Sequence, residues 1–280
     1  MTQKQTILAV LAHPDDESFG MGGTLALYAE RGVDVHLICA TRGEVGEMDE
    51  KYMQGFNSIA ERREAELRCA AGILGLEGVH FLDYRDSGMP GSPDNEHPHA
   101  LFAQPIENVA EEVVAYIRDL KPDVVITFDP IGGYRHPDHI AIHQATVLAF
   151  ENANNADFAP EAGTPFQPRK LYYHTISKGF LKLAVFFLRL FGKDPTKFGK
   201  NGDIDIASLA KVSFPIHARI SIRSVVEKKN AAGACHASQG GGQMQTGIRA
   251  MLSRFFEADV FMQAYPPIEG KTRIQRDLLN

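Results

Sequence analysis

Short apolar runs alternate with amphipathic segments along the first half of the chain. The apolar runs are of the type that predicts buried strands, and they cover Thr6–Leu11, Val33–Ala40, Val79–Leu82 and Val124–Phe128. The amphipathic segments have helical periodicity, and they cover roughly Met21–Arg31, Ile59–Leu74, Ile106–Leu120 and Ile140–Phe150. Strands that alternate with helices indicate βαβ units. The pattern therefore predicts an α/β fold with a Rossmann-like, mostly parallel sheet flanked by helices.

The pattern is less regular after residues 152–168, a stretch rich in Asn, Ala, Gly and Pro that predicts a long loop. Beyond it, residues 171–174, 213–220 and 255–265 predict strands, and residues 221–237 predict a helix. We therefore expect residues 1–175 to form the Rossmann-like core, and residues 176–280 to form a smaller C-terminal α+β portion that completes a pocket.

Residues 178–193 are the most apolar window of the chain, and they predict a helix with one stripe of cations: Lys178, Lys182, Arg189 and Lys193. The simplest interpretation is a buried helix whose cations reach water. An exposed helix of this kind would instead be an oligomer interface, a lid over the pocket or a membrane-surface anchor. We predict an oligomer interface or lid, and with it a homo-oligomer, in preference to membrane association, because large exposed apolar patches usually mark protein contacts.

Charge and cysteine content narrow the class of protein further. A net charge of −6, from 29 basic and 35 acidic residues, argues against a nucleic-acid partner. No segment has the length needed to span a bilayer, and the first residues lack a signal pattern. The three cysteines have no metal-binding spacing, and Cys39 and Cys69 fall in apolar patterns that predict buried free thiols. A reducing, cytoplasmic location fits these features.

Two turns rich in His and Asp follow two of the predicted strands. Residues 12–18 (AHPDDES) follow the first strand, and residues 132–139 (GGYRHPDH) follow the strand at 124–128. One such turn alone most often caps a helix, with the Asp accepting backbone N–H bonds. Right-handed crossovers, however, place the carboxyl ends of all parallel strands at one edge, where α/β sheets bind ligands. The pair of turns therefore predicts one metal site built from both.

The spacing of these residues suits a catalytic zinc site. His13 and Asp16, at i and i+3, can converge on one point together with His139. Two imidazoles and one carboxylate leave an open position for water, whose pKa a metal lowers to about 7. Asp15 is then the candidate general base. His143 is more simply explained as a residue behind the site than as a fourth ligand.

The remaining polar residues of the second turn suggest supporting roles. His136 could stabilise the oxyanion or protonate the leaving amine. Asp138 could hold an imidazole in the correct tautomer.

The two turns together resemble those of the LmbE/PIG-L family of zinc-dependent N-deacetylases, over about the first 175 residues. Four further segments are similar to one branch of that family, which contains the mycothiol-biosynthesis deacetylase and the mycothiol S-conjugate amidase: residues 41–47, 85–89, 132–134 and 170–173. After residue 178 only residues 236–239 (HASQ) resemble a family motif. Arg135 stands where the family commonly has a small residue, which would narrow the mouth of the site.

The resemblance implies a role for each matching residue. It implies zinc on His13, Asp16 and His139, with Asp15 as general base. It implies that His136 stabilises the oxyanion or acts as general acid, modulated by Asp138, and that Tyr134 is a mobile residue that reaches the tetrahedral intermediate. It also implies a set of substrate-binding residues: Arg63, Glu47, Asp86 and Met89. From the sequence alone, Arg63 reads more simply as a solvated helix-face charge paired with Glu66.

The residues and the resemblance together predict a cytoplasmic zinc amidohydrolase that removes an acyl group, most simply acetate, from an N-acyl amino sugar. One alternative is an amidase that cleaves a larger thiol conjugate of the mycothiol type. Another is a non-catalytic module that binds a sugar or nucleotide. A magnesium phosphoesterase using Asp15, Asp16 and Glu17 is disfavoured, because hard cations prefer oxygen ligands to the histidines present here.

Overall fold

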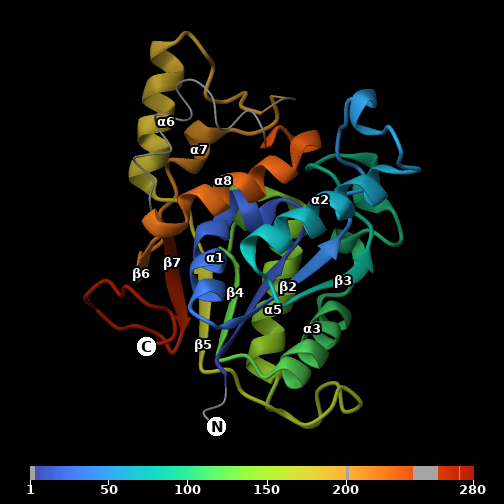
Figure 1. Cartoon of the computed structure of the whole chain (residues 1–280), viewed down its shortest axis with the longest axis vertical. Coiled ribbons are helices and arrows are strands. Elements are labelled where there is room, and N and C mark those ends of the chain that lie inside the picture. Colours follow the sequence, from blue (N-terminus) through green and yellow to red (C-terminus); the bar gives the residue numbers. More distant parts are fainter. Residues whose placement is uncertain (1–3, 200–201, 242–257, 271) are drawn as a thin grey trace.

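Seven strands form one mixed sheet in the order β3-β2-β1-β4-β5-β7-β6 in the computed structural model, which describes residues 4–199, 202–241, 258–270 and 272–280 (Figure 1). The strands are β1 (Thr6–Leu11), β2 (Asp34–Thr41), β3 (Gly78–Tyr84), β4 (Val124–Phe128), β5 (Lys170–His174), β6 (Ala218–Ser221) and β7 (Ala258–Tyr265). The first five are parallel, and β7 pairs antiparallel with both β5 and β6. The predicted α/β fold with a mostly parallel sheet is confirmed.

Two groups of helices cover the sheet. The main helices are α1 (Gly22–Glu30), α2 (Ile59–Leu74), α3 (Ile106–Leu120), α5 (Pro137–Asn152) and α8 (Val226–Cys235). Helices α1, α2 and α8 pack together, and α3 packs on α5 (Figure 1). Right-handed crossovers place these two groups on opposite faces of the sheet, because the chain moves outward from β1 in one direction and from β4 in the other.

The neighbouring strands β1 and β4 mark the point where the order of the strands reverses. Both strands are buried along their whole length, so each can leave the core only at its end. In open α/β sheets such a switch point opens a crevice at the carboxyl ends of the strands. The two His/Asp turns leave the sheet at this crevice, and the fold brings them together although more than a hundred residues separate them.

The C-terminal part of the chain extends the same sheet. Strand β6 begins at Ala218, later than predicted, because Pro215 cannot donate a hydrogen bond to a strand ladder. The start of the strand predicted at 255–265 lies outside the described residues, which resume at Ala258. Two further helices, α6 (Lys178–Leu190) and the short α7 (Ile206–Leu209), pack on each other and form a small apolar cluster of their own. In the described part of the chain, no helix combines the length and apolarity that crossing a bilayer requires.

One cysteine prediction is confirmed and another is wrong. Cys39 is buried and free, as expected. Cys69 in α2 is instead bonded to Cys235 at the end of α8, with 5.9 Å between their Cα atoms. The partner lies 166 residues further along the chain. Only the packing of α8 on α2 reveals the pair, because each cysteine by itself sits in an ordinary helical pattern.

Candidate metal centre and active site

Three side chains from the two turns form a small triangle of two imidazole nitrogens and one carboxylate, with a different oxygen of the carboxylate near each nitrogen. His13 Nδ1 lies 3.2 Å from His139 Nε2 and 3.6 Å from Asp16 Oδ2, and His139 Nε2 lies 3.3 Å from Asp16 Oδ1. Ligands about 2.0–2.2 Å from a tetrahedral zinc lie about 3.3–3.6 Å from each other. The triangle therefore has the size, and the two imidazoles and one carboxylate have the chemistry, to hold a zinc ion with one position open.

Electrostatics favour the protonation states that a metal needs in Asp16 and His139, but not in His13. Burial lowers the pKa of His13, but the carboxylates of Asp86, Asp138 and Asp16 outweigh it and raise that pKa well above its usual value. Burial raises the pKa of Asp16, but the fields of His139 and His13 outweigh it and hold that pKa below its usual value. Burial lowers the pKa of His139 to about 4. At neutral pH Asp16 is thus ionised and His139 is neutral, as metal ligation requires.

The second ring nitrogen of His13 faces two buried carboxylates. His13 Nε2 is 3.1 Å from Asp138 Oδ2 and 3.5 Å from Asp86 Oδ1. Asp138 is in turn fixed by Ser87, whose backbone N–H donates to Oδ2 at 2.9 Å and whose hydroxyl donates to Oδ1. A carboxylate behind a metal-binding histidine sets its tautomer and its orientation. The Asp138 carboxylate therefore supports His13, and the modulation of His136 by Asp138 that the resemblance implies stays a prediction.

Other groupings of the described residues also have metal-ligand spacing. One joins His13, His136 and His139, and another joins His13 and His136 with Asp86 and Asp138. The two carboxylates face the nitrogen of His13 that points away from His139. His136 Nδ1 accepts the backbone N–H of Asp138 at 3.2 Å as the N-cap of α5. The triangle of His13, Asp16 and His139 is therefore the candidate ligand set.

Asp15 lies next to the triangle but is held by a different partner. Its Oδ2 is 3.1 Å from Arg63 Nη2, which also donates to the carbonyl of Pro14 at 2.7 Å. Burial raises the pKa of Asp15 to about 6, against the opposing field of Arg63. Asp15 also has φ of 128°, a conformation that residues other than glycine rarely adopt. A carboxylate whose pKa lies close to neutrality, beside a metal site, has the properties of a general base.

Arg63 is not the solvated helix charge that the sequence alone suggested. The residue is buried, and its Nη1 donates to the carbonyl of Gly43 at 3.1 Å. Gly43 has a positive φ of 67°, and a Cβ atom there would lie 2.0 Å from Arg63 Nη1, so only glycine fits. Glu66 pairs with Arg62 and Ser238 instead. Arg63 contacts Asp15, the candidate general base, and substrate contact by Arg63 stays a prediction.

Two buried residues hold the turn that carries Asp15, a role that the sequence did not reveal. Glu17 Oε2 accepts the backbone N–H of Asp15 at 3.0 Å, and Glu17 Oε1 lies 2.7 Å from His236 Nε2. Neither Glu17 nor His236 is exposed to solvent. Because Glu17 points towards His236, it does not join Asp15 and Asp16 in the all-oxygen site of a magnesium phosphoesterase. The HASQ motif was the available signal for His236, whereas nothing local pointed to Glu17 as its partner.

Of the other residues that the sequence singled out, Tyr134 lies at the site, whereas His143, Glu47 and Met89 lie outside the ligand triangle. Tyr134 lies at the site, with its ring centroid 4.9 Å from that of His139 and 5.9 Å from that of His136. His143 binds the carbonyl of Phe128 at 2.8 Å and lies behind the site, outside the ligand triangle. Glu47 is exposed and Met89 is half-buried, and the hydrogen bonds of the described structure engage only their backbone carbonyls. Their place in the pocket lining stays a prediction.

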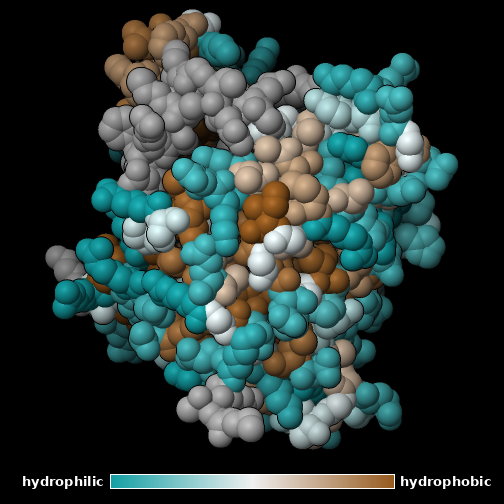
Figure 2. Space-filling model, viewed as in Figure 1, coloured by the Kyte–Doolittle hydropathy of each residue, from teal (hydrophilic) through white to brown (hydrophobic). Residues whose placement is uncertain are grey.

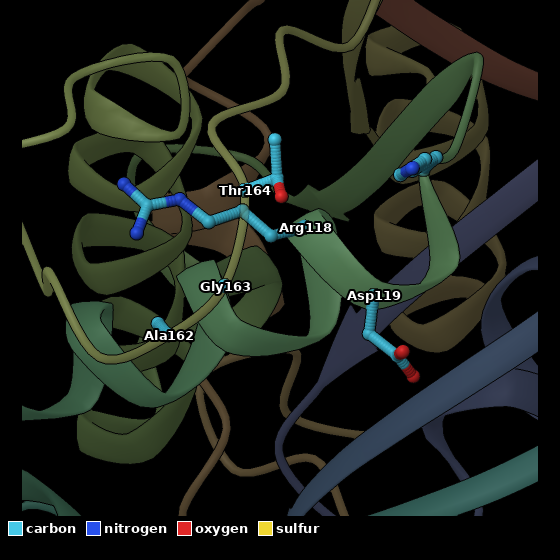
Figure 3. Close-up of a pocket in the computed structure, with 6 residues that line it drawn as sticks. Arg118, Asp119, Ala162, Gly163 and Thr164 are labelled. Carbon is cyan, nitrogen blue, oxygen red and sulfur yellow. The ribbon is translucent and has the colours of Figure 1, made fainter.

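A hollow of about 280 Å³ elsewhere on the molecule is unrelated to this chemistry (Figure 3). Its lining includes Arg118 and Lys121, which precede β4, so it lies at the amino edge of the sheet. The Arg118 guanidinium donates to four backbone carbonyls: those of Ala153, Asn155, Phe158 and Ala159. Arg118 thus fastens a loop, and its donors are not available to a ligand.

The fold and the site together define a metal-dependent hydrolase: a switch-point crevice with two histidines and a carboxylate in zinc geometry, and a separate carboxylate in the position of a base. The family described as PIG-L: GlcNAc-PI de-N-acetylase matches residues 8–150, and the chain belongs to this family of amide-hydrolysing deacetylases.

Relatives and solved structures agree with this assignment. The chain is 32% identical over 248 residues to the 1D-myo-inositol 2-acetamido-2-deoxy-alpha-D-glucopyranoside deacetylase of Geodermatophilus obscurus, covering 85% of this chain and 84% of the relative. It is 36% identical over 242 residues to the enzyme of the same description from Rhodococcus erythropolis, covering 83% and 80%. Its fold is similar to that of the N,N'-diacetylchitobiose deacetylase of Pyrococcus horikoshii, with a TM-score of 0.64, 19% identity and coverage of 93% and 84%.

Proposed function

We propose that this chain is a zinc-dependent N-deacetylase, with one zinc held by His13, Asp16 and His139. Its substrate is a small glycoside of N-acetylglucosamine, and its products are acetate and the free amino sugar. The relatives named above support the substrate class, since they act on an acetamido-glucopyranoside linked to inositol. The observation that carries the proposal is the ligand triangle with a separately held Asp15 beside it.

The arrangement of the site residues fits amide hydrolysis. Bound zinc supplies Lewis-acid chemistry, which polarises a carbonyl and lowers the pKa of a water molecule. Arg63 holds Asp15 Oδ2, so Oδ1 is the oxygen that takes the proton from the attacking water. The same proton then passes from Asp15 to the nitrogen of the amide as the C–N bond breaks, and an amine and acetic acid result.

His136 is suited to stabilise the oxyanion and unsuited to act as general acid. Its Nδ1 accepts the N-cap hydrogen bond from Asp138, so in the neutral ring the proton is on Nε2. Burial, with the neighbouring His13 and His139, holds the pKa of His136 well below its usual value, which keeps the ring neutral. A neutral imidazole with a fixed Nε2–H is a hydrogen-bond donor to developing negative charge. Tyr134, whose ring lies against His139 and His136, is the second candidate donor.

The role of Asp15 is tested by Asp15→Asn, with Asp83→Asn as the matched control. Asp83 is also an aspartate with positive φ, but its side chain is on the surface beside Arg42. We expect Asp15→Asn to lower kcat at least about a hundredfold, because a general base contributes about that much or more. Zinc content measured by elemental analysis should stay at one per chain. Full acetate release by Asp15→Asn would refute the assignment.

The substrate is tested with a panel of N-acylated sugars and one bulky thiol conjugate, assayed for the amine released. Faster cleavage of the conjugate than of N-acetylglucosaminyl-inositol would favour the amidase alternative. A cytoplasmic location remains part of the proposal. The Cys69–Cys235 bond removes one reason for expecting a reducing compartment, so cell fractionation is the direct test of location.

A further inference from the structure

Helix α6 exposes an apolar face of unusual size for a water-facing helix. Leu183 is 41% exposed, Phe186 59%, Leu190 63% and the capping Phe191 55%. The helix projects from the body of the molecule at one end of the sheet (Figure 1), and hydrophobic residues gather at its outer end (Figure 2). Leu183, Phe186 and Leu190 are spaced i, i+3 and i+7, so they form one stripe along the helix.

The exposed stripe is not the face by which α6 is attached. The attachment is made by Leu181, which is buried, and by Val185 and Leu188 beside it. These pack with Ile206 and Leu209 of α7 in the small apolar cluster. One side of α6 is therefore buried in the small apolar cluster, and the stripe of Leu183, Phe186 and Leu190 lies on a different side.

Cations flank the exposed stripe, and acids are absent from it. Lys178, Lys182 and Arg189 follow each other on one side of the helix, and Lys193 comes three residues after its end. The sequence has no acidic residue between Glu161 and Asp194. Within the described ranges, none of these four cations forms an ion pair with a carboxylate. This concentration of positive charge occurs in a chain whose net charge is −6.

We propose that this face of α6 docks on an anionic lipid bilayer. Exposed Phe and Leu beside a row of Lys and Arg are the features of a helix that lies in the bilayer interface: the apolar side chains enter the acyl boundary and the cations contact anionic headgroups. A second copy of the chain is a poorer occupant. Two-fold pairing of this face would set four cations against four others with no acid between them.

Docking through α6 would also orient the candidate active site. Helix α6 begins four residues after β5 ends at His174, so it rises from the carboxyl edge of the sheet, where the ligand triangle lies. Ile131 and Tyr134, from the loop that carries the second turn, pack against the same apolar cluster as α6. A surface bound by α6 would therefore face the edge of the sheet that carries the site.

The test is co-sedimentation of the purified full chain with vesicles at low salt. One set of vesicles contains 30% phosphatidylserine in phosphatidylcholine, and the other contains phosphatidylcholine alone. Lys182→Glu/Arg189→Glu removes two cations, and at about fivefold per cation near the surface we expect at least about 25-fold weaker binding. Phe186→Ser/Leu190→Ser should weaken binding at least about tenfold, because it removes the side chains that enter the bilayer.

A matched control makes the same chemical changes elsewhere. Ile274→Ser/Arg276→Glu alters an exposed apolar residue and an exposed cation near the C-terminal end, which lies far from α6 (Figure 1). This control should bind as the wild type does. All variants should keep wild-type deacetylase activity on a soluble substrate, which shows that they are folded.

Three results would overturn the proposal. The first is failure of the wild type to sediment with anionic vesicles. The second is equal sedimentation with the two vesicle compositions, or unchanged binding by both α6 variants. The third is a dimer in sedimentation velocity that Phe186→Ser/Leu190→Ser abolishes while no vesicle binding is seen, which would make a second copy of the chain the occupant of the face.

Discussion

Replacing Glu17 by glutamine tests how the catalytic turn is held in place. Glu17 joins the backbone of Asp15 to the ring of His236 through its two carboxylate oxygens. Asp15 has a strained backbone at φ of 128°, and such strain persists only when surrounding contacts hold it. Glu17 is therefore expected to keep the general base at the correct place beside the metal ligands.

The loss of stability follows from the hydrogen bonds that the glutamine amide cannot accept. Glutamine has the size of glutamate but offers one acceptor oxygen. Either Asp15 N–H loses its acceptor inside the protein, or the Ser18 hydroxyl and His236 Nε2 lose theirs. A buried donor without an acceptor costs about 1–3 kcal/mol. Burial lowers the pKa of His236, but the field of Glu17 outweighs it and raises that pKa, so the bond between them is charge-assisted. The upper end of the energy range therefore applies to its loss. At about 2–4 °C per kcal/mol, a loss of ~3 kcal/mol lowers Tm by roughly 6–12 °C.

The effect on catalysis should exceed the effect on folding. A shift of a reacting group by about 1 Å can cost about a hundredfold in rate, so we expect kcat to fall about 10- to 100-fold with little change in KM. Zinc content should be unchanged, because Glu17 contacts no metal ligand side chain in the described structure. The assay is steady-state acetate release, with each rate divided by the fraction of folded protein from thermal unfolding.

Asp259→Asn is the matched control for this experiment. Asp259 is also a buried carboxylate, and it accepts hydrogen bonds of 2.8 Å from Thr24 N, Thr24 Oγ1 and Lys229 Nζ. It should lose comparable stability and keep its kcat, since its partners lie outside the two catalytic turns. Wild-type kcat in Glu17→Gln, or an equal loss of kcat per folded molecule in both variants, would refute this role of Glu17.

Three further predictions follow from the geometry. Activity requires ionised Asp15, so kcat/KM should fall as the pH drops through about 6, the pKa of Asp15. Arg63→Gln removes the cation that lowers this pKa, and it should move the acidic limb of the pH profile to higher pH. Arg68→Gln, on the surface of the same helix, should leave the profile unchanged. Dialysis against a chelator should abolish turnover, zinc but not magnesium should restore it, and an active metal-free protein would disprove the metal assignment. Cys69→Ser/Cys235→Ser removes a disulfide bond between residues 166 positions apart, and it should lower the free energy of unfolding in urea by about 2–5 kcal/mol. An unchanged urea midpoint would mean that the bond does not form.

Much of the fold could be predicted because its pattern is local. The bounds of α2, α3 and β4 agree with the predicted ranges, since helical periodicity and continuous apolar runs are properties of neighbouring residues. Helix α5 begins three residues before the predicted start at Ile140, because His136 caps it and Pro137 takes the first helical position. Contacts distant in sequence could not be predicted in this way: neither the Cys69–Cys235 bond nor the pairing of Glu17 with His236 leaves a local trace.

By itself, the sequence determined which atoms are available for the chemistry: two strand-ending turns that together hold three histidines and four carboxylates. Their residue types and their place after strands favour a zinc site over a magnesium site. The tertiary structure decided which carboxylate does what. Asp16 faces the histidines, Asp15 faces Arg63, Glu17 faces His236 and Asp138 faces His13. The reason is that the pKa and the role of a carboxylate depend on the charge and hydrogen-bond donors within a few ångströms of it, and here those partners come from helices and strands far apart in the chain.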